Sequence, residues 1–423
     1  MTVEEQIHEI GGKARRASRA LALLSTEKKN AALLGMADAL LAQAPALLAA
    51  NARDIAGAEE NALGNAAIDR LRLTDARIQA MADGIRQVVA LGDPVGKTLA
   101  GWTRPNGIAI SKISTPIGVI GIIYESRPNV TSDAAILCIK TGNAVILRGG
   151  SESLHSNMAI AAALQAGGGS CGLPENAIQL IPTKDREAVR HMAQMDRFID
   201  LIIPRGGHSL IEAVVSHARM PVIKHYHGVC HVYVDRDADL EMALRVAINA
   251  KCQRPGVCNA METLLVHRDV AEAFLKMSAP AFGENGVAIH ADETAFAQLS
   301  ALDYQSLSVA EEADWSTEYL DLILSLRVVD SLDAAVAHME KYGSHHSDAI
   351  ITKNSATAER FLHEVDSATV YWNASTRFSD GGEFGFGAEI GISTDKLHAR
   401  GPMGLDELTT YKYLIRGEGQ IRE

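Results

Sequence analysis

The first part of the chain carries apolar residues at helical spacing. Through residues 1 to about 90, alanine and leucine recur at the positions that one face of an amphipathic helix would bury. One such face is marked by Leu33, Leu34, Met36, Ala37, Leu40 and Leu41. Pro45 and the stretch from Asn51 to Asp54 interrupt this pattern, so we expect breaks between helices at both places.

Turn residues follow this helical region. Gly92-Asp93-Pro94 and Arg104-Pro105-Asn106-Gly107 are both typical of tight turns. Because Asn106-Gly107 stands between two short β-like runs, we predict a β-hairpin over about residues 98–115.

From residue 116 onward, short β-branched runs alternate with helical segments. The first series has strand candidates at 117–123, 144–147, 178–181 and 199–203, with helices near 132–140, 153–166 and 185–194. A strand at 232–234 and a helix near 238–250 come next, and further strands are expected at 263–266, 320–329, 349–352 and 368–372. Such alternation predicts βαβ units and parallel sheets, here in two α/β domains joined near residues 230–260.

Composition narrows the class of protein. The chain has 423 residues, of which 47% are hydrophobic and 22% charged, which excludes a disordered or collagen-like chain. A net charge of -12 argues against a nucleic-acid partner. Five cysteines, an odd number, favour reduced thiols over a disulfide framework. We find no signal segment, and the apolar run 117–124 is far shorter than the ~20 residues of a membrane helix, so we predict a cytoplasmic protein.

Three glycine-rich loops are candidates for phosphate binding. Residues 167–172 match G-x-G-x-x-G, but a helix precedes them and a strand follows, so we interpret them as a helix end and a turn. Residues 148–152 and 204–209 instead follow strands and open helices, where backbone N–H groups favour an anion. Arg148 and Arg205 add positive charge, although each loop alone is also compatible with an ordinary turn.

A cysteine lies in a loop between a helix and a strand. Cys258 follows Gln253-Arg254-Pro255-Gly256, and Lys251 and Arg254 are the nearby cations able to lower its pKa. By spacing alone, Cys252 is a rival nucleophile. We expect Cys138, Cys171 and Cys230 to be buried and inert.

Histidines cluster in two segments. On a strand, His225, His227 and His231 would share one face, but no fourth ligand has a standard spacing, so we predict packing or an anionic substrate in place of a metal. His345 and His346 lie in a loop and are expected to be exposed.

Several motifs together resemble one family. They are the segments Pro116–Thr131, Lys140–Asn143, Arg148–Glu152, Gln253–Pro255 with Cys258-Asn259, Glu383–Gly387 and His398–Gly404. On these, the chain resembles the aldehyde dehydrogenase superfamily over almost its whole length, and in particular its gamma-glutamyl phosphate reductases.

The resemblance implies a fold and a domain plan. The fold is aldehyde dehydrogenase-like α/β, with a Rossmann-like cofactor domain over 1–97 and 116–232 and a catalytic domain over 233–403. Residues 98–115 and 404–423 would form the oligomerisation hairpin and the C-terminal strand.

The resemblance also implies roles for individual residues. Cys258 is the nucleophile. The cofactor, NADPH, would be held by Arg148, Ser151, Glu152, Gly206, Gly207, Ser209 and Glu318. The substrate would be bound by Arg127, Asn129, Arg254, Asn373, Ser375 and Arg377. No metal is implied, and Arg148 and Arg205 remain alternatives for the 2′-phosphate of the cofactor.

The activity so implied is the reduction of L-glutamyl 5-phosphate to L-glutamate 5-semialdehyde and phosphate, the second step of proline biosynthesis. It proceeds through a thioacyl group on the cysteine. His225-Tyr226-His227-Gly228 stands where oxidising members carry a glutamate base, which fits a reductase that must avoid hydrolysis. The oxyanion asparagine of the family aligns with Glu125, which leaves the oxyanion donor open beyond the Cys258 N–H. A homo-oligomer is implied, and a glutamate 5-kinase is a candidate partner.

Two other interpretations stay open. One is another aldehyde or acyl-phosphate dehydrogenase on the same fold, which the phosphate requirement of the reaction would distinguish. The other is a non-catalytic scaffold or metal-binding protein built around His225, His227 and His231.

Overall fold

The computed structural model describes residues 2–422 and divides the chain into two compact units. Unit 1 comprises the chain up to Lys224, together with Gly385–Gly391 and the segment from Met403 onward. Unit 2 comprises His225–Phe384 and Ile392–Pro402. Unit 2 thus begins before residue 233, where the sequence places the start of the catalytic domain.

A four-stranded parallel sheet forms the centre of unit 1. Its order is β5-β4-β3-β6. The strands are β3 (Val119–Tyr124), β4 (Ala144–Arg148), β5 (Ile178–Leu180) and β6 (Leu201–Arg205). All four were predicted, because strands buried on both faces of a parallel sheet are continuous β-branched runs.

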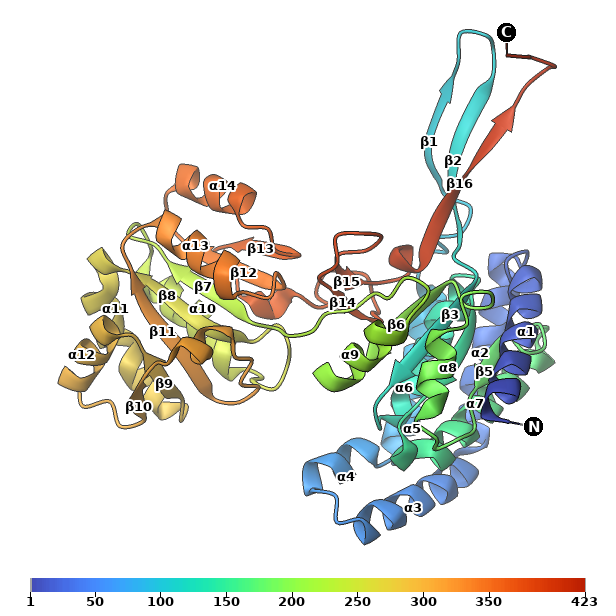
Figure 1. The fold of residues 1–423 in the computed structure, drawn as a ribbon, viewed down its shortest axis with the longest axis horizontal. Helices are drawn as coiled ribbons and strands as arrows, with labels where there is room; N and C mark the ends of the chain where they lie inside the picture. Colours follow the sequence, from blue (N-terminus) through green and yellow to red (C-terminus); the bar gives the residue numbers. More distant parts are fainter. Residues whose placement is uncertain (1, 423) are drawn as a thin grey trace. The chain divides into compact units, whose positions relative to one another are not determined.

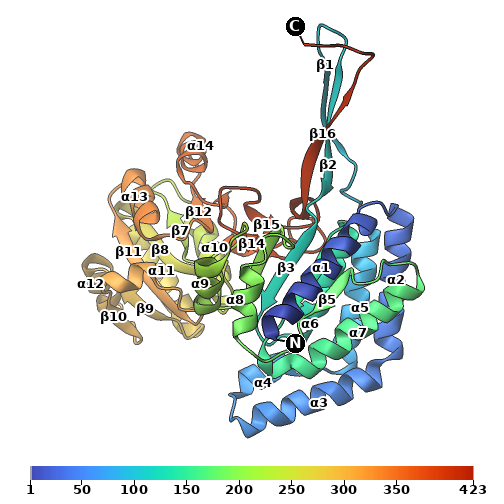
Figure 2. The same cartoon turned by 45° about the vertical axis from the view of Figure 1, so that its right-hand side comes forward.

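Helices cover both faces of this sheet (Figure 2). The helices of unit 1 are α1 (Val3–Leu21), α2 (Thr26–Ala42), α3 (Ala44–Glu60), α4 (Asn65–Leu71), α5 (Asp75–Ala90), α6 (Pro128–Lys140), α7 (Leu154–Ser170), α8 (Glu187–Ala193) and α9 (His208–His217). Helices α1, α8 and α9 pack with one face of the sheet in a single apolar cluster. Helices α6 and α7 contact the sheet, and α2, α3 and α5 pack against them as a further layer.

The expected helix break at Asn51–Asp54 is wrong, because α3 runs through it. Asn51 and Asp54 are buried and bond to other elements. The Asn51 amide bonds to the backbone of Leu71 and Leu73, and the Asp54 carboxylate accepts the N–H of Ser156 at 2.7 Å. Asp54 therefore caps the start of α7, a role that no local pattern reveals.

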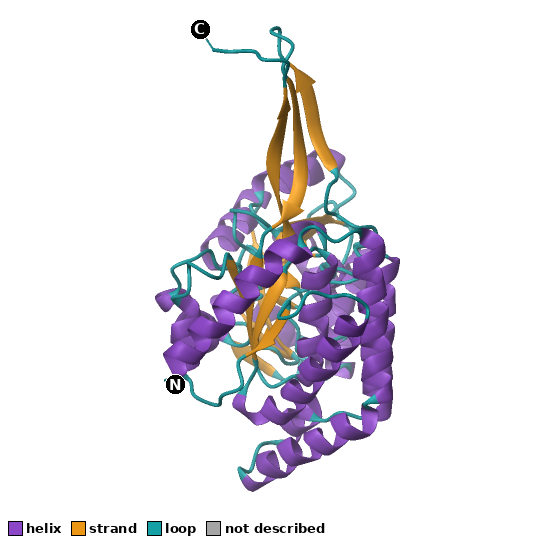
Figure 3. Cartoon of the chain, turned by 90° about the vertical axis from the view of Figure 1, so that its right-hand side faces the viewer, coloured by secondary structure: helices purple, strands orange, loops and turns teal. Residues whose placement is uncertain are grey.

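A three-stranded antiparallel sheet projects from the rest of unit 1 (Figures 1 and 3). It consists of β1 (Thr98–Thr103), β2 (Ala109–Pro116) and β16 (Thr409–Arg416), in the order β1-β2-β16. The predicted hairpin over 98–115 is confirmed. Gly107 has φ +87° in the turn, a conformation that favours glycine.

Unit 2 is built on a seven-stranded parallel sheet of order β10-β9-β11-β8-β7-β12-β13. Its strands are β7 (Cys230–Val234), β8 (Met261–His267), β9 (Ala288–Ala291), β10 (Leu307–Val309), β11 (Ile323–Val329), β12 (Ser347–Ile351) and β13 (Thr369–Trp372). Its helices are α10 (Leu240–Cys252), α11 (Arg268–Glu284), α12 (Glu293–Ala301), α13 (Leu332–Tyr342) and α14 (Ser355–Glu364). Helices α10, α11 and α12 contribute to one apolar cluster, and α13 and α14 to another.

Short elements complete the chain. They are the 3-10 helices η1 (Ser151–Ser153), η2 (Glu312–Ser316), η3 (Thr376–Phe378) and η4 (Asp406–Leu408), and the strand pair β14 (Gly391–Ser393) and β15 (Gly401–Met403). No single helix within residues 2–422 is long and apolar enough to cross a membrane, although the bent pair α2 and α3 passes together by length and composition.

The glycines at 167–172 form the end of a helix and a turn, not a nucleotide-binding loop between a strand and a helix. Helix α7 continues through Gly167, Gly168 and Gly169, and Gly172 takes φ +90° in the turn after it, as predicted. A Cβ on Gly167 would lie 2.2 Å from the Gly35 carbonyl oxygen on α2. Gly167 therefore serves close packing between α7 and α2.

This contact gives a matched test. Gly167→Ala is expected to lower the free energy of unfolding by about 1–3 kcal/mol through overpacking, less the ~1 kcal/mol gained from helix propensity. Gly169→Ala, in the same helix with no atom within 4 Å of the added Cβ, should be neutral or stabilising. Urea unfolding of both variants measures the difference, and equal stabilities would refute the packing role.

Candidate functional site

The loop that carries Cys258 is closed at its base by a buried ion pair. Helix α10 ends at Cys252 and β8 begins at Met261, so the loop spans residues 253–260. Lys251 Nζ lies 2.6 Å from Glu262 Oε2, and both side chains are fully buried. The pair joins the two ends of the loop.

Lys251 is thereby committed to Glu262, and its predicted role as the cation beside Cys258 finds no support in the structure. Burial lowers the pKa of Lys251 and raises the pKa of Glu262 to about 7, while each charge favours the ionised form of the other. The second Glu262 oxygen accepts the Leu320 N–H at 3.4 Å. The pair therefore also ties the loop to the segment that holds Glu318.

Two arginines supply the positive charge near the cysteine. Burial lowers the pKa of Arg377, repulsion from Arg254 lowers it further, and attraction to Cys258 raises it. Arg377 Nε donates to Gln253 Oε1 at 2.9 Å, and its guanidinium also bonds the Asn259 side chain. Arg377 thus bridges both ends of the segment around Cys258.

Asn259 reinforces this connection. Its amide nitrogen donates to the Ser379 carbonyl oxygen at 2.9 Å, and its own carbonyl accepts the Thr376 hydroxyl at 2.8 Å. The sequence analysis assigned Asn259 and Gln253 no role, because their partners lie more than a hundred residues away and leave no local signal.

Gly228 lies directly against the loop that carries Cys258. A Cβ at this position would come within 1.9 Å of the Cys258 carbonyl oxygen, so only glycine allows the contact. The Gly228 N–H donates to Glu318 Oε1 at 2.9 Å. The structure therefore brings Glu318 next to the segment that touches Cys258, and burial raises the pKa of Glu318.

The prediction that His225, His227 and His231 share a strand face is wrong, because β7 begins only at Cys230. His225 Nδ1 lies 3.0 Å from the Ile392 carbonyl oxygen, and His227 lies 3.8 Å from Glu318. His231 is buried against Asp348 at 2.8 Å. Within residues 2–422 no group of His, Cys, Asp or Glu has the geometry of a metal site.

Two other expectations about single side chains are also wrong. His346 is fully buried rather than exposed, and burial lowers its pKa to about 3. Cys171 is exposed, whereas Cys138 and Cys230 are buried as predicted.

In unit 1, the loop after β4 forms a tight cradle. Added Cβ atoms on Gly149 and Gly150 would clash with Asn157 and Ser126 at 2.1 and 2.2 Å. Arg148 is 7% exposed, and its Nε has no hydrogen-bond partner within the described chain. Glu152 accepts from the hydroxyls of Ser126 and Ser151. A buried, incompletely bonded arginine beside a glycine cradle fits an anionic or hydroxylated ligand.

The loop at the start of α9 differs. The Gly207 N–H donates to Glu125 Oε1 at 2.8 Å, so a protein carboxylate already bonds this amide. A Cβ on Gly206 would meet Glu125 at 2.7 Å. The side chain of Arg205 lies against Gly391, and Ser209 sits in the first turn of α9. A phosphate group at this helix start must displace Glu125 or use the neighbouring amides.

The predicted substrate residues divide between the two units. In unit 1, Arg127 is the exposed N-cap of α6, and Asn129 donates to Asp133 at 2.9 Å. In unit 2, Asn373 has φ +56° and exchanges two hydrogen bonds with the Thr352 backbone. Ser375 caps η3 through the Arg377 N–H. Asn373 and Ser375 thus shape the segment that presents Arg377.

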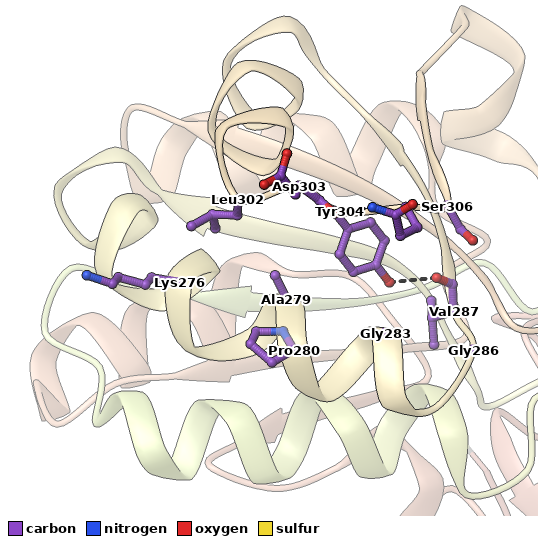
Figure 4. A pocket seen from close by; sticks show the side chains of 11 residues that line it. Lys276, Ala279, Pro280, Gly283, Gly286, Val287, Leu302, Asp303, Tyr304 and Ser306 are labelled. Atoms are coloured by element: carbon purple, nitrogen blue, oxygen red, sulfur yellow. Dashed lines mark hydrogen bonds between the residues drawn. The ribbon is translucent and has the colours of Figure 1, made fainter.

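A cavity of about 460 Å³ lies elsewhere in unit 2 (Figure 4). Lys276, Pro280 and Tyr304 are among the residues that line it, and the Tyr304 hydroxyl donates to the Val287 carbonyl oxygen at 2.6 Å. None of its lining residues is a predicted site residue.

Comparisons with known proteins decide the family. The aldehyde dehydrogenase family model matches residues 2–296. The chain belongs to the aldehyde dehydrogenase family. It is 57% identical to the gamma-glutamyl phosphate reductase of Moorella thermoacetica and 56% identical to that of Geotalea daltonii, with all of each chain covered.

A solved structure agrees with this assignment. The gamma-glutamyl phosphate reductase of Thermotoga maritima is 44% identical and superposes with a TM-score of 0.96, covering 99% of this chain and all of that one. The expected resemblance and the aldehyde dehydrogenase-like α/β fold are confirmed, and the protein is an oxidoreductase of this family.

The buried ion pair gives a stability prediction. Lys251→Met leaves the Glu262 carboxylate buried without its partner, so we expect a loss of about 3–5 kcal/mol in the free energy of unfolding. The double variant Lys251→Met/Glu262→Leu should recover most of that loss, because both charges are gone. Denaturant titration of the two variants measures the effect. A double variant as unstable as the single one would contradict it.

Proposed function

We propose that this enzyme reduces L-glutamyl 5-phosphate to L-glutamate 5-semialdehyde with NADPH, the second step of proline biosynthesis. The supporting observation is the cysteine loop with Arg254 and Arg377 around Cys258, in a chain whose full-length relatives carry the name of that reductase.

Cys258 is the proposed nucleophile. Its thiolate attacks the acyl carbon of the substrate, a C–S bond forms, and the C–O bond to phosphate breaks, so that phosphate leaves with the electron pair. Arg254 and Arg377 favour the thiolate and attract the anionic substrate. The backbone N–H of Cys258 is the proposed oxyanion donor.

The cofactor-binding role is proposed for the Arg148 loop with Ser151 and Glu152, for Gly206, Gly207 and Ser209, and for Glu318. The Arg148 cradle fits best, since its guanidinium is buried and has an unused donor. Arg148 is therefore our choice for recognising NADPH. When bound, this cofactor supplies the hydride that converts the acyl group to the aldehyde. Cys258 then leaves as a thiolate and is ready for another turnover.

Four further residues are proposed to serve the substrate. Arg127, exposed at the start of α6, would bind a carboxylate or phosphate, with Asn129 two residues further on in the first turn. Asn373 and Ser375 would act mainly by holding the segment of Arg377, since their side chains bond to the backbone.

Replacing the nucleophile tests the proposal. Cys258→Ala should reduce the phosphate-dependent oxidation of glutamate 5-semialdehyde, the reverse reaction, by a factor on the order of 10³ or more. Binding of NADPH, measured by its fluorescence, should be retained, because Cys258 is not one of the residues proposed to bind the cofactor. NADPH should also bind more tightly than NADH.

Cys252→Ala is the matched control and should keep its activity. The reverse result, loss with Cys252→Ala and full activity with Cys258→Ala, would move the nucleophile to Cys252. Oxidation that proceeds equally well without phosphate would instead indicate a hydrolytic aldehyde dehydrogenase.

We also propose that the β1-β2-β16 sheet joins copies of this chain. Its exposed side chains include Leu99, Trp102, Tyr411, Tyr413 and Ile415, with Trp102 and Tyr413 in edge-to-face contact at 6.2 Å. An exposed apolar set on a projecting sheet is typical of an interface.

The variant Trp102→Glu/Tyr413→Glu should therefore lower the mass of the purified protein, measured by light scattering at one concentration. Leu23→Glu changes a leucine after α1 that is even more exposed, and it should leave the mass unchanged. An unchanged mass in both variants would contradict the proposal that this sheet forms the interface.

A cytoplasmic location and a glutamate 5-kinase partner complete the proposal. None of the five cysteines forms a disulfide bond within residues 2–422, which is compatible with a reducing compartment. The kinase would supply the labile acyl phosphate, and size-exclusion chromatography of the two mixed proteins tests their association.

A further inference from the structure

A second cysteine lies behind the nucleophile and has no part in the mechanism above. Cys230 is the first residue of β7 and is fully buried. Its Sγ donates to the carbonyl oxygen of Cys258 at 3.2 Å and lies 3.7 Å from His346 Nδ1. A buried thiol therefore bonds directly to the peptide of the proposed nucleophile.

A chain of buried polar groups supports this thiol. His346 Nδ1 lies 2.8 Å from the Ser347 hydroxyl, which in turn lies within hydrogen-bond distance of Thr369 and Ser379. The Ser379 carbonyl accepts the side-chain amide of Asn259, the residue after Cys258. The polar chain that begins at the Cys258 carbonyl thus returns to the neighbouring residue.

We propose that Cys230 is a positioning residue, which holds the Cys258 carbonyl and so fixes the direction of the reactive thiol. The inference rests on the proposed function, in which Cys258 is the nucleophile. The carbonyl of Cys258 defines the peptide plane that follows its Cα atom. Because β8 holds the chain from Met261 onward, fixing this plane restricts the direction of the Cα–Cβ bond of Cys258. The thiol holds this carbonyl from one side, and Gly228 lies against it where a Cβ would come within 1.9 Å.

The chemistry of Cys230 suits a donor more than a nucleophile. Burial raises its pKa well above the ordinary value, and the charges of Asp348 and Cys258 raise it further. The sulfur therefore keeps its proton and continues to donate.

The test compares three variants of Cys230. Cys230→Ala and Cys230→Val remove the donor, the second while filling the space, and Cys230→Ser keeps a donor. We expect kcat for phosphate-dependent semialdehyde oxidation to fall on the order of 10- to 100-fold without the donor. KM should stay within about twofold, since substrate contacts are intact. The serine variant should retain most of kcat.

A second readout follows Cys258 itself. Its alkylation by iodoacetamide, measured by mass spectrometry across a pH series, should show a shifted apparent pKa in the alanine and valine variants and an unshifted one in the serine variant. A role in stability alone would leave this profile unchanged. Should Cys230→Ala fail to fold, Cys230→Val gives the same comparison.

Cys138→Ala is the matched control, because it removes another fully buried thiol from α6 in unit 1. It should leave kcat and the alkylation profile unchanged. The inference is overturned if the donor-free variants keep wild-type kcat and profile, or if serine is as impaired as valine. Activity in Cys258→Ala would instead refute the proposed nucleophile, so the two failures are distinguishable.

Discussion

The site in unit 2 depends on one close contact, that of the Gly228 backbone with the carbonyl of Cys258. The same glycine donates its N–H to Glu318, and Cys230, two residues further on, donates its thiol to the same carbonyl. The segment 228–230 therefore contacts the loop that carries Cys258. It also orients Glu318, the carboxylate proposed to bind the cofactor. Any side chain at position 228 would push this segment away from the Cys258 carbonyl. It would thereby disturb the contacts of both Glu318 and Cys230, whereas a change at either of those residues would affect only one of these contacts.

Charge in this enzyme acts locally. The net charge of -12 opposes an anionic substrate and cofactor. Lys251 does not offset this negative charge near the cysteine, because its own charge is balanced by Glu262 inside the core. Arg377, which is attracted to Cys258 and repelled by Arg254, is the cation that we propose to act at the thiol. Arg377 also bonds Gln253 and Asn259, so the group proposed to attract the substrate is the same one that holds the loop.

Local pattern reveals much of the fold and less of the site. The alternation of β-branched runs predicted the four strands of unit 1 and most strands of unit 2, since burial on both faces leaves a clear signal. Strands β9 and β10 were missed because both are short; β10 forms the edge of the sheet and β9 lies next to it. Asn51 and Asp54 seemed to break a helix, yet they bond to elements far along the chain. His346, Asn259 and Cys230 likewise owe their surroundings to contacts that only folding creates.

The carboxylates near Cys258 bear on how the proposed reaction would favour reduction over hydrolysis. A base that activates water needs a carboxylate free to accept a proton beside the thioester. Here Glu262 is bonded to Lys251 and Glu318 to the Gly228 N–H, and residues 225–228 contain two histidines and no carboxylate. His225 is itself bonded to the Ile392 carbonyl. In the proposed reaction, these hydrogen bonds would engage the carboxylates nearest the acyl group and so disfavour its hydrolysis.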